Sequence, residues 1–206
     1  MNYNKKTVKD VDVKGKKVLL RCDFNVPQDK ATGEITSDKR IVAALPTIKY
    51  LLENGAAIIA CSHLGKPKNG PEAKFSLSPV AKRLGELLNQ EVIMANDVAG
   101  PDAQAKAAAL QPGQIMLLEN TRFEKGETKN DPELAKKMAA LAGPDGVFVS
   151  DAFGSVHRGR VGVSARRVRL FNRKRIEIPR RRDCQSQTAL SRYFGRRESL
   201  FQNRRN

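Results

Sequence analysis

Cationic side chains and histidines recur in this chain just after short apolar runs. The run Ile58–Ser62 passes directly into the turn His63–Lys66, which carries an imidazole and an ammonium group. Arginines and lysines gathered in this way suit a multiply charged anion, such as a molecule with a phosphate and a carboxylate, because guanidinium groups bind both through paired hydrogen bonds. The polar positions of this kind are Asp23, Asn25, Arg40, His63, Lys66, Asn120, Arg122, Asp151, His157 and Arg158.

Apolar runs bounded by turn residues predict five buried strands, and helical patterns separate them. The predicted strands are Val18–Cys22, Ala56–Ser62, Val92–Met94, Gln114–Leu118 and Val147–Ser150. This alternation predicts an α/β fold, a doubly wound parallel sheet with flanking helices. In such a sheet the carboxyl ends of the strands meet at one edge, so we expect the polar groups above to converge there.

Four helices are expected between these strands, and their ends carry recognisable signals. Ser37–Asp38 offers an N-cap for the first helix, Gly55 is its predicted C′ residue, and Pro46 inside it should kink it. Ser78–Pro79 is expected to start the second helix. The predicted helices are Lys39–Asn54, Val80–Asn89, Asp102–Leu110 and a segment that starts at Asn130–Pro132 and ends near Ala142.

Composition places the chain among globular proteins and excludes several site types. Hydrophobic residues make up 40% of it, with no apolar run of membrane-spanning length and no signal-peptide pattern. Cys22, Cys61 and Cys184 lack metal-ligand spacing, and the first two, inside apolar runs, are expected in the core. A reducing, cytoplasmic setting fits this usage. Neither G-x-G-x-x-G after a strand nor G-x-x-x-x-G-K-[ST] occurs.

The net charge of +16 is concentrated at the end of the chain. Residues 1–158 contain 23 lysines and arginines against 19 acids, whereas residues 159–206 contain 15 against 3. The cation also changes, from 18 lysines and 5 arginines in the first part to 1 lysine and 14 arginines in the second. The basic character therefore belongs to the tail, and the two parts need separate explanations.

Five motifs together resemble one enzyme family. They are LRCDFNVP, SDKRI, SHLGKPK, LLENTRFEKGE and VSDAFGSVHR, and they stand in this order along the chain. Over about Val8–Arg158 the chain resembles the N-terminal domain of phosphoglycerate kinase. The resemblance implies a glycolytic, cytoplasmic and usually monomeric phosphotransferase that moves a phosphoryl group between 1,3-bisphosphoglycerate and ADP, giving 3-phosphoglycerate and ATP. Its cofactor would be Mg-ATP or Mg-ADP, bound by the family's C-terminal domain.

The resemblance also implies a role for individual residues. Asp23, Phe24 and Asn25 would line the substrate, and Arg40, as the catalytic residue, would contact it and the transferring phosphoryl group. The residues of the turn around the substrate would be His63, Leu64, Gly65 and Lys66, with Arg122 and Arg158 completing the basic patch. Position 66 is commonly arginine in the family, and lysine keeps the charge but loses the planar fork of donors.

Beyond Val161–Val163 the match to the family ends. We therefore expect two parts, a phosphoglycerate-binding domain over residues 1–163 and an Arg-rich, disordered tail over residues 164–206. The family's nucleotide loop is not matched, so we expect no nucleotide or metal site here and a truncated chain that is inactive alone.

An alternative is a non-catalytic anion-binding module with a nucleic-acid-binding arm. The tail's charge would give salt-dependent phosphate binding, and Tyr193, Phe194 and Phe201 could stack on bases. Non-specific binding of polyanions by the tail is expected in either case.

The composition of the tail has a further explanation. Codons can be chosen for Leu170–Arg182 that, translated one base later, give FLIEKELKFLGE, and the same shift further on gives AILGGAKV. Both resemble the family's next segments. We hypothesise that residues from about Ser164 onward are a frameshifted translation of the same gene. Sequencing the DNA across codons 155–170 tests this, and the hypothesis fails if no single-base change restores the family frame.

Overall fold

One parallel sheet organises the part of the chain that the structure describes. The computed structural model describes residues 7–29, 31–68, 70–152 and 170–171, all within the first of two compact units, Met1–Asn172 and Arg173–Asn206. The strands lie in the order β3-β4-β2-β1-β5-β6, and every neighbouring pair is parallel. Their bounds are β1 Lys17–Arg21, β2 Ala57–Cys61, β3 Val92–Met94, β4 Ile115–Leu117, β5 Val147–Ser150 and β6 Leu170–Phe171.

All five strands predicted from the apolar runs are present, with ends that differ by at most one residue. The short strand β6 was not predicted, and it pairs with β5 through Val149 opposite Leu170. It lies in the segment that was expected to be irregular; the rest of residues 164–206 lies outside the described residues.

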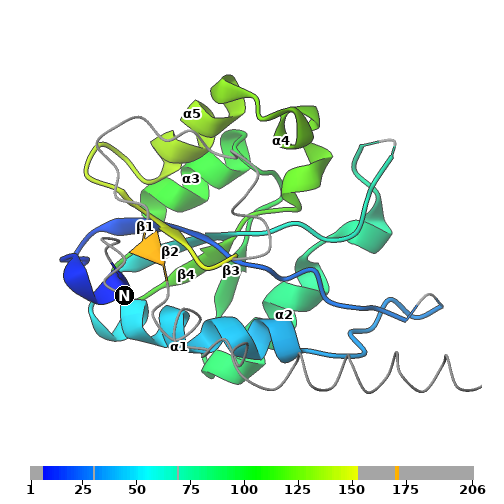
Figure 1. Ribbon diagram of the computed structural model, residues 1–206, viewed down its shortest axis with the longest axis horizontal. Helices are drawn as coiled ribbons and strands as arrows, with labels where there is room; N and C mark the ends of the chain where they lie inside the picture. Colours follow the sequence, from blue (N-terminus) through cyan, green and yellow to red (C-terminus); the bar gives the residue numbers. More distant parts are fainter. Residues whose placement is uncertain (1–6, 30, 69, 153–169, 172–206) are drawn as a thin grey trace, which may run out of the picture. The chain divides into compact units, whose positions relative to one another are not determined.

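Helices cover both faces of the sheet, which confirms the doubly wound arrangement (Figure 1). On one face lie α1 (Lys39–Glu53) and α2 (Ser78–Leu88), and on the other lie α3 (Pro101–Ala109) and α5 (Pro132–Leu141). The short α4 (Lys125–Lys129) and the 3-10 turns η1 (Val8–Asp10), η2 (Ala73–Phe75) and η3 (Thr121–Phe123) complete the elements. No helix in the described ranges is long and apolar enough to cross a membrane.

Alternate residues of each strand supply the two apolar cores. In β1, Val18 and Leu20 pack beneath α1 and α2, whereas Leu19 packs on the side of α3 and α5. All three are at most 1% exposed. Burial on both faces explains why these strands are apolar throughout rather than alternating with polar residues.

Two helix starts differ from the sequence prediction, because a tertiary contact takes the carboxylate of Asp38 and because Ser78 lies within the helix rather than at its N-cap. Asp38 stands at the N-cap of α1, but its carboxylate accepts hydrogen bonds from Nε and Nη2 of Arg83 in α2, at 3.0 and 2.8 Å, rather than from the helix backbone. Ser78 lies inside α2, and its backbone N–H donates to the hydroxyl of Ser76 instead.

The predicted end of α1 is confirmed. Gly55 has φ of +70° and its N–H donates to the carbonyl of Leu52, while the N–H of Ala56 donates to that of Leu51. This pair of bonds is a Schellman motif, and it turns the chain directly into β2. The helix continues through Pro46.

A buried ion pair ties the end of β1 to the segment after β4. Nη2 of Arg21 lies 3.2 Å from Oε1 of Glu127 in α4, and the two side chains are 10% and 6% exposed. Nη1 of Arg21 also donates to the hydroxyl of Thr121 in η3, at 2.9 Å. A charge buried in this way depends on its partner, because removing one member leaves the other desolvated and uncompensated.

Glu127→Ala is expected to lower the free energy of unfolding by about 3–5 kcal/mol, because it leaves the Arg21 guanidinium buried without its carboxylate. Urea unfolding of the purified chain measures this. Glu124→Ala, an exposed glutamate three residues earlier, serves as the control and is expected to change stability by less than about 0.5 kcal/mol. Equal effects of the two substitutions would contradict the role of the pair.

Cys22 and Cys61 are expected to resist thiol reagents in the native state. Both are reduced and buried, and burial raises the pKa of the Cys61 thiol, so the reactive thiolate of Cys61 is scarce at pH 8. In a Cys184→Ser variant, Ellman's reagent should label neither thiol without denaturant and both thiols in urea. Rapid labelling of the folded variant would show that these cysteines are not core residues.

Candidate functional site

The candidate site lies between the carboxyl ends of β2 and β4. These strands are neighbours, yet the chain leaves β2 toward α2 on one face and leaves β4 toward α4 and α5, with α5 on the other face. Neighbouring strands whose connections diverge leave a crevice at their carboxyl ends, which is where open α/β sheets bind ligands. The turn His63–Lys66 follows β2 and residues 119–123 follow β4, so both lie at this edge of the sheet.

Side chains from two other strand ends hold the turn through its backbone. The N–H of Gly65 donates to Oδ1 of Asn25, which follows β1, at 2.8 Å. The N–H of Leu64 donates to Oδ1 of Asn120, which follows β4, at 3.1 Å. Nη1 of Arg122 in turn donates to the carbonyl of Gly65. These two amides are therefore engaged within the protein, so the turn offers a ligand its side chains rather than a cradle of free N–H groups.

Asp23 and Arg40 form an ion pair at the same edge. Nη1 of Arg40, in the first turn of α1, lies 2.5 Å from Oδ2 of Asp23 after β1. The arginine side chain is 48% exposed and the aspartate 21%, so this pair faces solvent, unlike that of Arg21 and Glu127. An arginine at a helix start is unfavourable for the helix dipole, and the carboxylate of Asp23 compensates for it.

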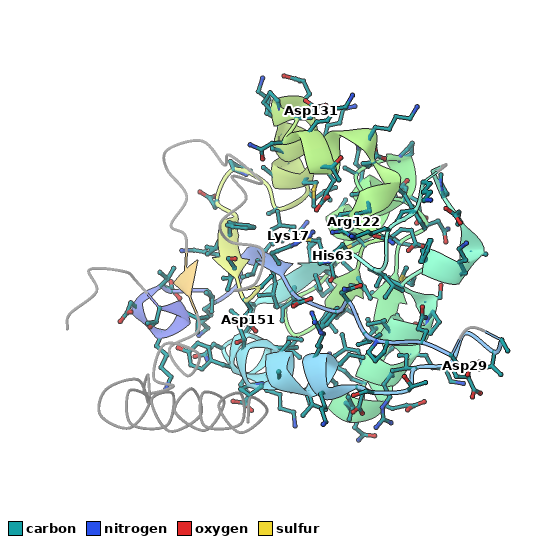
Figure 2. The ribbon with its side chains drawn as sticks, turned by 45° about the vertical axis from the view of Figure 1, so that its right-hand side comes forward. Lys17, Asp29, His63, Arg122, Asp131 and Asp151 are labelled. Atoms are coloured by element: carbon teal, nitrogen blue, oxygen red, sulfur yellow. The ribbon has the colours of Figure 1, made fainter. Side chains whose placement is uncertain are left out.

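The predicted site residues differ in how far their side chains are exposed to solvent. Arg40 and Lys66 are exposed, and Arg122 and Asn25 are half-buried. His63, which is labelled together with Arg122 in Figure 2, is 9% exposed.

Phe24 and Leu64 are buried. They are 0% and 2% exposed and pack in the core beneath α1 and α2, so their side chains serve the fold. The N–H of Phe24 donates to the hydroxyl of Ser62 at 2.8 Å.

Asp151, at the end of β5, is 4% exposed, and its N–H donates to the carbonyl of Arg21. The predicted site residues His157 and Arg158 lie outside the described residues.

Two buried hydroxyls support the site and were not predicted. The hydroxyl of Ser62 receives the N–H of Phe24, and the carbonyl of Ser62 accepts hydrogen bonds from both the N–H and the hydroxyl of Thr121, each at 3.0 Å. Ser62 and Thr121 are both 0% exposed. One feature of the sequence could have indicated Thr121. Arg21 is a charged residue inside the apolar run of β1, so it requires buried partners, and the hydroxyl of Thr121 is one of them.

The site gathers positive charge that suits an anion. Lys66 and His63 belong to the turn, Arg122 donates to its backbone, and Arg40 lies at the same sheet edge in a pair with Asp23. Positive groups of this kind suit a multiply charged anion. Within the described ranges no group of three or more His, Cys, Asp or Glu side chains could hold a metal ion.

Comparison with known proteins points to a single family. The family model described as phosphoglycerate kinase matches residues 8–170. A phosphoglycerate kinase of Clostridium botulinum strain Hall is 56% identical over 169 residues, which cover 80% of this chain and 41% of that protein. A second, from strain Langeland, is 55% identical over the same length. The chain thus spans about 41% of the length of these relatives.

Solved structures agree with the sequence matches. The phosphoglycerate kinase of Coxiella burnetii superposes with a TM-score of 0.69 at 42% identity, over 81% of this chain and 40% of that one. The enzyme of Pyrococcus horikoshii OT3 gives a TM-score of 0.73 at 34% identity, over 84% of this chain and 44% of that one. With a family match over most of its length and this shared fold, the chain belongs to the phosphoglycerate kinase family.

Proposed function

We propose that the crevice between β2 and β4 is the 3-phosphoglycerate half of a phosphoglycerate kinase active site. The observation that carries the proposal is the convergence of three strand ends on one cationic turn. Asn25, Asn120 and Arg122 all bind the backbone of His63–Lys66, and that turn carries the exposed ammonium group of Lys66 and the nearly buried imidazole of His63. The substrate, 3-phosphoglycerate or 1,3-bisphosphoglycerate, carries the phosphate and carboxyl chemistry that such a site recognises.

Individual roles follow from exposure and charge. Arg122, Lys66 and His63 would bind the phosphate and carboxylate of the substrate, and Asn25 and Gly65 would shape the turn around it. Lysine at position 66 supplies a point charge rather than a bidentate fork. Phe24 and Leu64 act from beneath, through the packing that fixes the strand ends.

One further arginine belongs to the proposed substrate-binding residues. Arg158 would complete the basic patch, and it lies outside the described residues.

Arg40 is the proposed catalytic residue. Phosphoryl transfer depends mainly on positioning and on neutralising the charge of the transferring group. An exposed guanidinium whose position is held by the carboxylate of Asp23 would meet this need, because it is positively charged and keeps further donors for a ligand. In the family reaction the Mg-bound nucleotide would be the other reactant: ADP would accept the phosphoryl group of 1,3-bisphosphoglycerate, or ATP would donate one to 3-phosphoglycerate. The residues at this edge of the sheet would bind and orient the phosphoglycerate.

The 206-residue chain is expected to bind 3-phosphoglycerate more tightly than inorganic phosphate, because only the larger anion can engage both ends of the cationic turn. Isothermal titration with each anion, and with Mg-ATP, measures this at one fixed ionic strength. Binding of Mg-ATP and kinase turnover should both be negligible.

Equal affinity for both anions would instead support the non-catalytic anion-binding module. Measurable turnover by the purified chain would contradict the assignment of binding without transfer.

Arg40→Gln is expected to weaken 3-phosphoglycerate binding by about 10- to 100-fold, the range that corresponds to about 1.5–3 kcal/mol for a hydrogen bond to a charged group. Lys136→Gln is the matched control. It removes one positive charge from α5, where Lys136 pairs with Glu133 at the surface, and it should leave the affinity within about twofold. If both variants lose the same affinity, only net charge matters and the site assignment fails.

A further inference from the structure

All the hydrogen-bonding positions of the Asn120 side-chain amide are used within the protein. This side chain is 0% exposed. Oδ1 accepts from the N–H groups of Leu64 and Arg122, each at 3.1 Å, and Nδ2 donates to the carbonyls of Leu64 and Phe75, at 2.8 and 2.9 Å. A primary amide has two acceptor and two donor positions, so all four are occupied.

These four bonds join three separate segments of the site. Two go to Leu64, one in each direction, so Asn120 pairs with the turn much as a neighbouring strand would. The third fixes the backbone of Arg122, whose guanidinium donates to the carbonyl of Gly65. The fourth goes to Phe75, at the end of η2. One side chain thus sets the relative placement of the turn, the arginine and η2.

The bond to Phe75 matters because Phe75 packs against the turn. Gly65 has φ of +59°, and a Cβ built at this position would overlap the Phe75 ring. Only glycine therefore fits at position 65, where the backbone passes close to the aromatic ring. By holding the backbone of Phe75, Asn120 also fixes the surface on which Gly65 rests.

No other residue type reproduces this pattern at the same size. Leucine would leave four buried backbone groups without a partner, which is costly. Aspartate, nearly the same shape, keeps the two acceptor bonds but places a negative charge against two carbonyl oxygens. Asparagine alone matches two N–H donors on one side and two carbonyl acceptors on the other.

We propose that Asn120 is a positioning residue for anion binding, which sets the geometry of His63–Lys66 and Arg122 without touching the ligand. This inference rests on the proposed function, since the ligand that reports on it is 3-phosphoglycerate. The affinity for the anion would then depend on the buried, neutral amide of Asn120 as well as on the cationic side chains.

The test compares Asn120→Asp and Asn120→Ala with Leu51→Ala in the full chain. Leu51 is 0% exposed and lies in the last turn of α1, at the opposite end of that helix from Arg40, so its truncation destabilises the fold without contacting the turn. Both Asn120 variants should weaken 3-phosphoglycerate binding at least about tenfold, whereas Leu51→Ala should stay within about twofold. Circular dichroism confirms that each titrated variant is folded.

A double-mutant cycle separates positioning from general stability. If Asn120 acts through Arg122, Asn120→Asp should cost much less affinity in an Arg122→Gln background than in the unmodified chain. Additive losses, or Asn120 variants that bind within about twofold of the unmodified chain, would overturn the proposal.

Amide hydrogen exchange supplies a readout that needs no ligand. In the Asn120 variants the N–H groups of Leu64 and Arg122 should exchange faster, while that of Gly15, which donates to the carbonyl of Gly55 at the far edge, should not change. If the unmodified chain binds no 3-phosphoglycerate, the proposed function is wrong, whatever the exchange rates are. If the N–H groups of Leu64 and Arg122 exchange at unchanged rates in the Asn120 variants, the positioning role is wrong.

Discussion

The fold and the site both depend on hydrogen bonds made just beyond the carboxyl ends of β2 and β4. Here the ladder of the parallel sheet ends, and the backbone groups that follow would be left buried without partners. Side chains replace the ladder: Asn120 pairs with Leu64, and Thr121 binds the carbonyl of Ser62 with both its N–H and its hydroxyl. The crevice is therefore lined by fixed backbone, and the charged side chains above it start from fixed positions.

This arrangement separates the groups that hold the site from those that meet a ligand. Most of the supporting groups are neutral and buried, such as Ser62, Asn120 and Thr121. Among the proposed binding groups, Arg40 and Lys66 are charged and exposed, whereas Arg122 is half-buried and also supports the turn. The charged side chains remain hydrated until the anion binds. Because hydrogen bonds already hold the backbone that carries them, less conformational entropy is lost on binding.

The strands and the end of α1 could be predicted from the sequence, each for its own physical reason. The apolar runs predicted the five longer strands because burial on both faces leaves no room for alternation, and Gly55 marked the end of α1 through its left-handed conformation. Contacts between distant segments were not predictable. Asp38 had the type and place of an N-cap, and only the tertiary fold brings Arg83 to it. The buried role of Glu127 likewise depends on Arg21, which lies 106 positions away in sequence.

The central claim is that a phosphoglycerate binds at the carboxyl ends of β1, β2 and β4, and nuclear magnetic resonance tests it most directly. Titrating 3-phosphoglycerate into the ¹⁵N-labelled chain should shift the amides of residues 23–25, 63–66 and 120–123. The amides of Lys14–Lys17 and Gly55, at the opposite edge of the sheet, should not move. Shifts spread over the whole basic surface, or confined to residues beyond Val163, would contradict the account.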